Sequence, residues 1–255
     1  MKLLEWIGVG INRLIHEMGA IALLFSQTLR WTLRRPLGLA NLVKQMEDVG
    51  ANSLPVVLIT AISTGMVLAF QSYIGFKRFN AESLLGTVVA LSMTRELGPV
   101  LTGLIVSGRA GAAIAAELGT MRVTEQIDAL ATMAVNPIKF LIVPRVLAGL
   151  IMMPILTGIA DAVGIAGGYL VGVRVLGVNP VIYIRRTWDY LELEDIFGGL
   201  LKAAVFGVII ALISCYKGFN AQGGAQGVGQ ATTGAVVIAS VLILISDYFM
   251  TAMLF

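Results

Sequence analysis

Five long apolar segments constrain this chain more than any other feature. Each is long enough to cross about 30 Å of hydrocarbon as an α-helix that rises about 1.5 Å per residue. Inside a bilayer the backbone must satisfy its own hydrogen bonds, which favours helices for such segments. The sequence therefore predicts an all-α polytopic membrane protein with five transmembrane helices. Their approximate limits are residues 51–76, 83–108 with a polar-side extension to about 119, 144–173, 197–217 and 233–255.

The composition supports a membrane environment. Of the 255 residues, 57% are hydrophobic and 13% are charged, against roughly 25% charged in ordinary soluble domains. A net charge of +3 would suggest a nucleic-acid partner for a soluble chain. Here the basic residues stand beside apolar segments, as topology signals and headgroup contacts do. We expect no nucleic-acid partner and one membrane domain over residues 1–255, with the five-span bundle in 51–255.

An amphipathic segment precedes the spans. Between Lys2 and Met18, apolar residues recur every three or four positions, opposite polar and charged ones, as on a two-sided helix. The segment has neither the uninterrupted apolar core of a signal peptide nor the acid-poor composition of a transit peptide. Residues 1–35 are predicted to form an interfacial helix that lies on the membrane.

The basic residues orient the spans. Eleven lysines and arginines fall on the membrane face that holds the N-terminus, and five fall on the other face. Positive charge is concentrated in cytoplasmic loops. The N-terminus is therefore expected in the cytoplasm, and an odd number of spans places the C-terminus on the opposite side.

The sequence offers little for catalysis. The only histidine, His16, lies on the polar side of the interfacial segment, so HExxH and Ser-His chemistry lack their central residue. The GxxxxGK[ST] loop that binds ATP phosphates is absent. One cysteine, Cys215, allows neither an internal disulfide nor a zinc framework. The chain is predicted not to be an enzyme and to hold no metal or cofactor of its own.

Charged residues inside the apolar segments are candidates for function. A charge at the centre of a transmembrane helix costs about 2.5–3.5 kcal/mol, so it normally faces a partner or a cavity. Arg95 and Glu96 are adjacent, so they point about 100° apart and cannot pair face to face. We interpret these two as functional. Lys202 is instead predicted to form a packing ion pair with either Asp161 or Asp247.

Local breaks and small residues follow the charged pair. Pro99 has no N–H for the carbonyl of Arg95, so the helix is predicted to kink or open there. Small residues then recur at every fourth position in the second and third spans, which indicates close helix packing. They are Gly103, Ser107, Gly111, Ala115 and Gly119, followed by Gly164, Gly168 and Gly172.

A short polar helix is predicted between the second and third spans, at about residues 122–133. The sequence MRVTEQIDALATMAVNP suggests a cap near Thr124, Glu125 in the first turn and an end at Asn136-Pro137. Such an amphipathic cytoplasmic helix suits the groove of a partner protein.

Several motifs carry a resemblance to a known family. ALSMTRELGPV, GRAGAAIAAELGTMRVTEQIDALATMAVNP, PRVLAGLIMMP and GQATTGAVV resemble the MlaE/YrbE-type permeases of bacterial MCE-associated phospholipid ABC transporters. The resemblance implies a homodimer in the bacterial inner membrane, with a periplasmic C-terminus. It also implies three kinds of partner: two cytoplasmic ATPase subunits that bind ATP and Mg, a hexameric MCE-domain protein and an accessory regulatory subunit. Together they would move phospholipid between the inner membrane and the MCE carrier for outer-membrane lipid homeostasis.

The resemblance also implies two sites. The coupling site for the ATPase would comprise Glu117, Arg122, Glu125, Gln126 and Asp128. The lipid cavity would comprise Leu68, Phe76, Phe79, Arg95, Glu96 and Leu97. Two other functions stay open. A proton-coupled secondary transporter would use Asp161, Lys202 and Asp247, and a non-transporting scaffold would only anchor the MCE assembly.

Overall fold

The protein is described by a computed structural model that covers residues 2–34 and 38–254, without the side chains of 2–11, 13 and 14. Throughout this part of the chain the regular structure is helical, with no strand. The predicted all-α polytopic fold is confirmed, because five helical segments are long and apolar enough to span a membrane. These segments are Leu39–Lys77, Glu82–Val123, Ile138–Val175, Leu193–Phe219 and Gly224–Leu254.

The first span begins earlier than predicted. It consists of α2 (Leu39–Met46), a π-helical turn η1 (Glu47–Ala51) and α3 (Leu54–Lys77). The sequence-based limit fell at residue 51 because polar residues interrupt the apolar pattern before it. The helix continues through them, with Gln45 buried against the bundle.

The second span is one long rod with two wider turns. It runs through η2 (Glu82–Leu84) and α4 (Leu85–Ser92) to α6, and its length of 42 residues exceeds what a bilayer requires. The opening predicted at the charged pair is present, because the π-helical turn η3 covers that pair directly before Pro99. The remaining elements of the rod are η3 (Met93–Leu97), α5 (Gly98–Val106), η4 (Ser107–Gly111) and α6 (Ala112–Val123).

The other spans are simpler. The third comprises η5 (Ile138–Ile142), α8 (Val143–Tyr169) and η6 (Leu170–Val175). The fourth and fifth are single helices, α10 (Leu193–Phe219) and α11 (Gly224–Leu254). Two short helices join spans: α7 (Gln126–Thr132) follows the second, and α9 (Pro180–Tyr190) follows the third.

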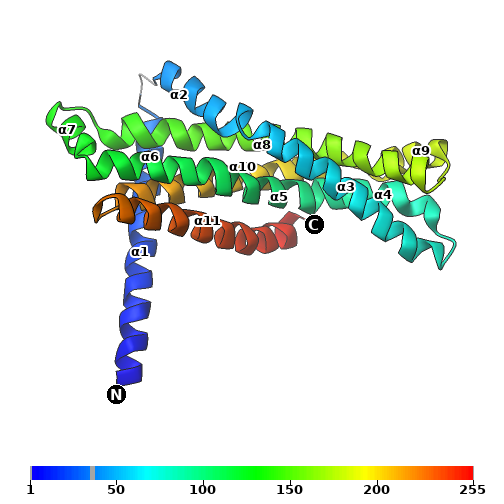
Figure 1. Ribbon diagram of the computed structural model, residues 1–255, viewed down its shortest axis with the longest axis horizontal. Helices are drawn as coiled ribbons and strands as arrows, with labels where there is room; N and C mark the ends of the chain where they lie inside the picture. The colour runs from blue at the N-terminus through cyan, green and yellow to red at the C-terminus, as the bar shows by residue number, and fades with distance from the viewer. Residues whose placement is uncertain (1, 35–37, 255) are drawn as a thin grey trace.

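The N-terminal helix differs in direction from the spans. α1 (Lys2–Thr32) is continuous and runs across the long axis of the bundle, at the end where α7 lies, whereas α9 lies at the opposite end (Figure 1). This direction agrees with the predicted interfacial helix, because a helix that lies on a membrane runs across helices that cross it.

Small residues hold the spans close together. A methyl group on Gly149 of α8 or Gly207 of α10 would collide with the backbone carbonyl of the other glycine, so the two backbones touch. The predicted ridge on the second span has the same role. Gly103 faces side chains of both α10 and α11, Gly111 faces side chains of α10, and Gly119 faces Val228 of α11.

Candidate functional site

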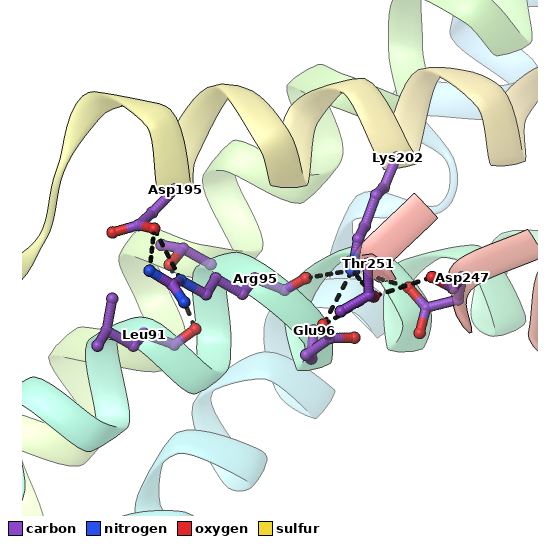
Figure 2. A network of polar contacts seen from close by, with 8 residues as sticks. Leu91, Arg95, Glu96, Asp195, Lys202, Asp247 and Thr251 are labelled. Carbon is purple, nitrogen blue, oxygen red and sulfur yellow. Dashed lines mark hydrogen bonds and ion pairs between the residues drawn. The ribbon is translucent and has the colours of Figure 1, made fainter. Parts of the chain in front are cut away.

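A fully buried lysine lies at the centre of the polar residues in the membrane core. Lys202, on α10, donates from its ammonium group to the backbone oxygen of Arg95 (2.9 Å), to Glu96 Oε1 (2.9 Å) and to Thr251 Oγ1 (2.6 Å) (Figure 2). The oxygen of Arg95 is the one to which Pro99 cannot donate. A side chain from another span therefore satisfies the backbone that the proline leaves open.

The structure decides which acid pairs with Lys202. Asp247 Oδ1 lies 3.1 Å from the Lys202 Nζ and forms an ion pair with it, but it accepts no hydrogen bond from the described residues. Asp161 instead faces Gly98, where a methyl group would collide with its carboxylate. Its Oδ1 accepts no hydrogen bond from the described residues. Of the two predicted alternatives, the pair with Asp247 is correct.

Arg95 extends in the opposite direction along the rod. Its Nε and Nη2 lie 2.7 Å and 2.6 Å from Oδ1 of Asp195, a buried residue in the first turn of α10. The other oxygen of Asp195 accepts the backbone N–H of Glu192 at 3.0 Å. Asp195 therefore has two roles: it caps its own helix and it forms an ion pair with Arg95.

Asp195 was not among the site residues predicted from the sequence. Its polar neighbours resemble a loop, and the prediction placed the start of the fourth span at residue 197. The spacing of Glu192 and Asp195 directly before an apolar run was the available signal, because acidic residues three apart form the capping box of α10.

The predicted lipid-cavity residues divide into three groups. Leu68, Phe76 and Leu97 pack, partly buried, on one apolar cluster between α3, α4 and α9. Arg95 and Glu96 pair with α10, yet each side chain keeps 39% of its surface exposed. Phe79 is 80% exposed. Both charged residues therefore form the ion pairs that a packing role requires, and their contact with lipid stays a prediction.

The polar hairpin at the other end of the rod differs in one detail from the prediction. Thr124 does not cap the short helix, because α6 extends through Val123 and the Thr124 hydroxyl donates to the Thr120 carbonyl at 2.8 Å. Glu125 holds the N-cap position of α7 in a left-handed conformation, with φ at 59°. The chain therefore turns sharply between α6 and α7.

Ion pairs hold this hairpin in place. Glu117 on α6 pairs at 2.7 Å with Arg145, a buried residue of α8 that also donates to the Leu141 carbonyl at 2.6 Å. Arg122 pairs with Asp128 of α7 at 2.6 Å. Three of the five predicted coupling residues therefore fix the hairpin.

The two remaining coupling residues, Glu125 and Gln126, are exposed at the tip. Between them and the core, Ile127 is buried and anchors α7. The tip is thus fixed in position while its polar groups stay accessible to a partner.

Comparison with known proteins assigns the family. Residues 42–253 match the family of the permease MlaE, which covers all five spans except the first residues of the first and the last of the fifth. The chain belongs to the MlaE permease family. It is therefore a multi-pass membrane protein, and the resemblance found in its motifs is confirmed.

Relatives of this MlaE-family permease come from distant organisms. A probable ABC transporter permease protein of Rickettsia typhi is 50% identical over 255 residues, which cover 100% of this chain and 98% of that protein. The intermembrane phospholipid transport system permease protein MlaE of Haemophilus influenzae is 43% identical, over 84% of this chain and 82% of that protein. The chloroplastic protein TRIGALACTOSYLDIACYLGLYCEROL 1 of Arabidopsis thaliana is 38% identical, over 92% of this chain and 67% of that protein.

Proposed function

We propose that this chain is the membrane permease of an ATP-driven transporter that moves phospholipid between the inner membrane and an extracytoplasmic MCE-domain carrier, for outer-membrane lipid homeostasis. One observation carries the proposal. The candidate cavity residues Arg95 and Glu96 lie on the helical rod Glu82–Val123, and the far end of the same rod forms the candidate coupling hairpin together with α7. About 27 residues separate Glu96 from the end of α6, or roughly 40 Å along a helix.

A rod of this kind can transmit movement between the two sites. The Glu117 to Arg145 pair ties its hairpin end to α8, and the Lys202 contacts tie its charged turn to α10 and α11. A push on α7 would therefore displace the rod relative to α10 and change the surroundings of Arg95 and Glu96. Two ATPase subunits, which bind ATP and Mg, would supply that push from the cytoplasm.

A homodimer would enclose the lipid. In the most apolar part of Gly224–Leu254 only 17% of the residues are buried, and in Leu39–Lys77 28%, against 61% in Ile138–Val175. We propose that a second copy covers part of these exposed faces. Between the copies, Leu68, Phe76, Phe79 and Leu97 would contact acyl chains. Arg95 would face the phosphate, beside Glu96.

The orientation follows from the basic residues. The N-terminus and α7 would lie on the cytoplasmic side of the bacterial inner membrane, and the C-terminus in the periplasm. The hexameric MCE-domain protein would then bind at the end that carries α9, and an accessory regulatory subunit would complete the assembly.

The first test is a charge reversal at the exposed tip of the hairpin. The permease, its ATPase and its MCE partner are reconstituted in liposomes, and transfer of fluorescent phospholipid is measured after ATP is added. Glu125→Lys should reduce transfer at least tenfold, whereas Glu47→Lys, an equal charge change at an exposed residue of η1, should leave it within a factor of two. Equal transfer by both variants would refute the coupling role of α7.

The same liposomes separate the alternative functions. A proton-coupled transporter would move lipid under a proton gradient without ATP, and substitution of Asp161 would abolish that movement. A scaffold would tolerate Glu125→Lys as well as it tolerates Glu47→Lys. The proposed transporter requires ATP and is insensitive to the gradient.

A further inference from the structure

A second candidate site, which combines polar and apolar residues, lies away from the rod Glu82–Val123, near α1, α2 and the start of the third span. Its pocket has a volume of about 230 Å³. Most of the wall is apolar, and Lys139 and Asn41 supply polar groups. The apolar side chains in the wall are Leu42, Val135, Phe140, Val143, Pro144 and Leu147.

Each of the two asparagines in the pocket wall already forms hydrogen bonds with the backbone. The amide nitrogen of Asn41 donates to the Phe140 carbonyl at 2.9 Å. The amide oxygen of Asn136 accepts the backbone N–H groups of Ile138 and Lys139 at 3.0 Å and 3.2 Å. The ammonium group of Lys139 is therefore the charged group of this pocket, and it forms no hydrogen bond with the described residues.

A second cation shares the environment of Lys139. The Lys139 Nζ lies 5.8 Å from the ring centroid of Trp31, and the Arg34 Cζ lies 5.1 Å from the same centroid. Both distances are measured to the same centroid, so the charged groups of Lys139 and Arg34 can be no farther apart than the two distances added together. Neither forms an ion pair with an acidic residue in the described part of the chain. The indole face attracts both cations, but it does not neutralise them.

The position of the pocket indicates which anion compensates these charges. Gly38 and Asn41 stand at the start of Leu39–Lys77, and Lys139 stands at the start of Ile138–Val175, so the pocket lies where two spans enter the membrane at the same face. Trp31 belongs to α1, which runs across that end of the bundle (Figure 1). Tryptophan is typical of the headgroup layer, and phosphate is the anion present there.

We propose that this pocket binds one anionic phospholipid as a resident lipid. Its phosphate would lie against Lys139 and Arg34, and the beginning of an acyl chain would occupy the apolar pocket. Basic pockets between transmembrane helices bind anionic headgroups in this way. The lipid would join α1 to the bundle through Trp31, and it would be distinct from any transported lipid, because the site shares no residue with the candidate cavity.

The test uses the purified permease in detergent and native mass spectrometry. Phosphatidylglycerol is titrated against phosphatidylcholine, which has the same acyl chains but no net charge. The wild-type protein should retain one phosphatidylglycerol in preference to phosphatidylcholine. Lys139→Gln should weaken retention of phosphatidylglycerol about fivefold, the effect of one basic residue near a lipid surface, and Lys139→Arg should restore it.

Two further variants separate the pocket from general charge. Lys44→Gln removes an equal charge from an exposed residue of α2 outside the pocket, and retention should not change. Gly38→Leu fills the pocket without removing charge. Gly38 has φ of −72°, and an added Cβ would meet nothing closer than Asn41 Cβ at 4.0 Å, so the variant should fold and lose the lipid.

Three results would overturn the proposal: equal loss in Lys44→Gln and Lys139→Gln, equal retention of phosphatidylcholine, or full displacement of phosphatidylglycerol by millimolar inorganic phosphate. The last would indicate a site for free phosphate. None of these measurements uses ATP or the partner proteins. A failure here therefore leaves the proposed transport function untouched, and the reverse is also true.

Discussion

The charged residues in the middle of the second span and those at its hairpin end are compensated in different environments. In the middle, Arg95 and Glu96 reach α10, where Asp195 and Lys202 are 3% and 0% exposed. At the end, Arg122 and Asp128 pair at a similar distance, but they are 39% and 60% exposed. The shortest nitrogen-to-oxygen distances are alike, but water reaches the partners of Arg95 and Glu96 far less than it reaches Asp128.

That difference determines what each charge contributes. A buried charge that loses its partner stays uncompensated, because no water replaces the partner, so the middle of the rod is sensitive to single substitutions. An exposed charge is solvated when its partner is removed, so the end of the rod tolerates substitution. The end can therefore contact a partner protein at little cost to folding, whereas the middle couples folding and function.

The strongest test of this comparison is Lys202→Met. The substitution leaves the Arg95 carbonyl and Glu96 without the lysine donor that they share, and Asp247 without its ion-pair partner. It should reduce stability by about 3–5 kcal/mol. The measurement is the unfolding temperature of the purified protein in detergent. In the double variant Lys202→Met/Glu96→Gln one uncompensated charge is removed, so part of the loss should be recovered. A single variant as stable as the wild type would contradict the difference between middle and end.

A smaller effect is expected for Arg95→Ala. It leaves the buried carboxylate of Asp195 with only the Glu192 N–H, and a hydrogen bond to a charged group contributes about 1.5–3 kcal/mol. Because Arg95 is partly exposed, we expect the lower part of that range. Arg95→Lys keeps a positive charge and should recover part of the stability.

Function and packing at Arg95 can be separated with the same two variants. If Arg95 contacts lipid phosphate, Arg95→Lys should lose transfer activity in liposomes to a greater extent than its stability predicts, because a lysine lacks the planar fork of the guanidinium. Transfer that follows stability in both variants would indicate a packing role alone.

The sequence predicted the parts of the molecule that depend on local pattern. The five apolar runs were enough to predict the spans, and Pro99 was enough to predict the opening at the charged turn. Both features depend only on a single helix and the environment around it. The partner of Lys202 was left open between two acids, since the choice depends on how α10 and α11 are aligned against the rod. Asp195 was missed because its polar neighbours resemble a loop, although the spacing of Glu192 and Asp195 was a local signal for the start of α10. The limits of α6 and the first span were wrong by several residues, because packing continues these helices beyond their apolar cores.

The smallest effect is expected at the end of the rod, for Arg122→Ala. The substitution removes the exposed pair with Asp128, which should contribute less than about 1 kcal/mol and weaken further as salt screens it. The unfolding temperature should therefore change little, and the difference from wild type should shrink between low and high salt. If the loss were as large as that of Arg95→Ala, or independent of salt, the hairpin would be part of the rigid core. Because Ile127 and the Glu117 to Arg145 pair remain, we expect the hairpin to keep its position, and any loss of ATP-dependent transfer would then report on contact with the ATPase.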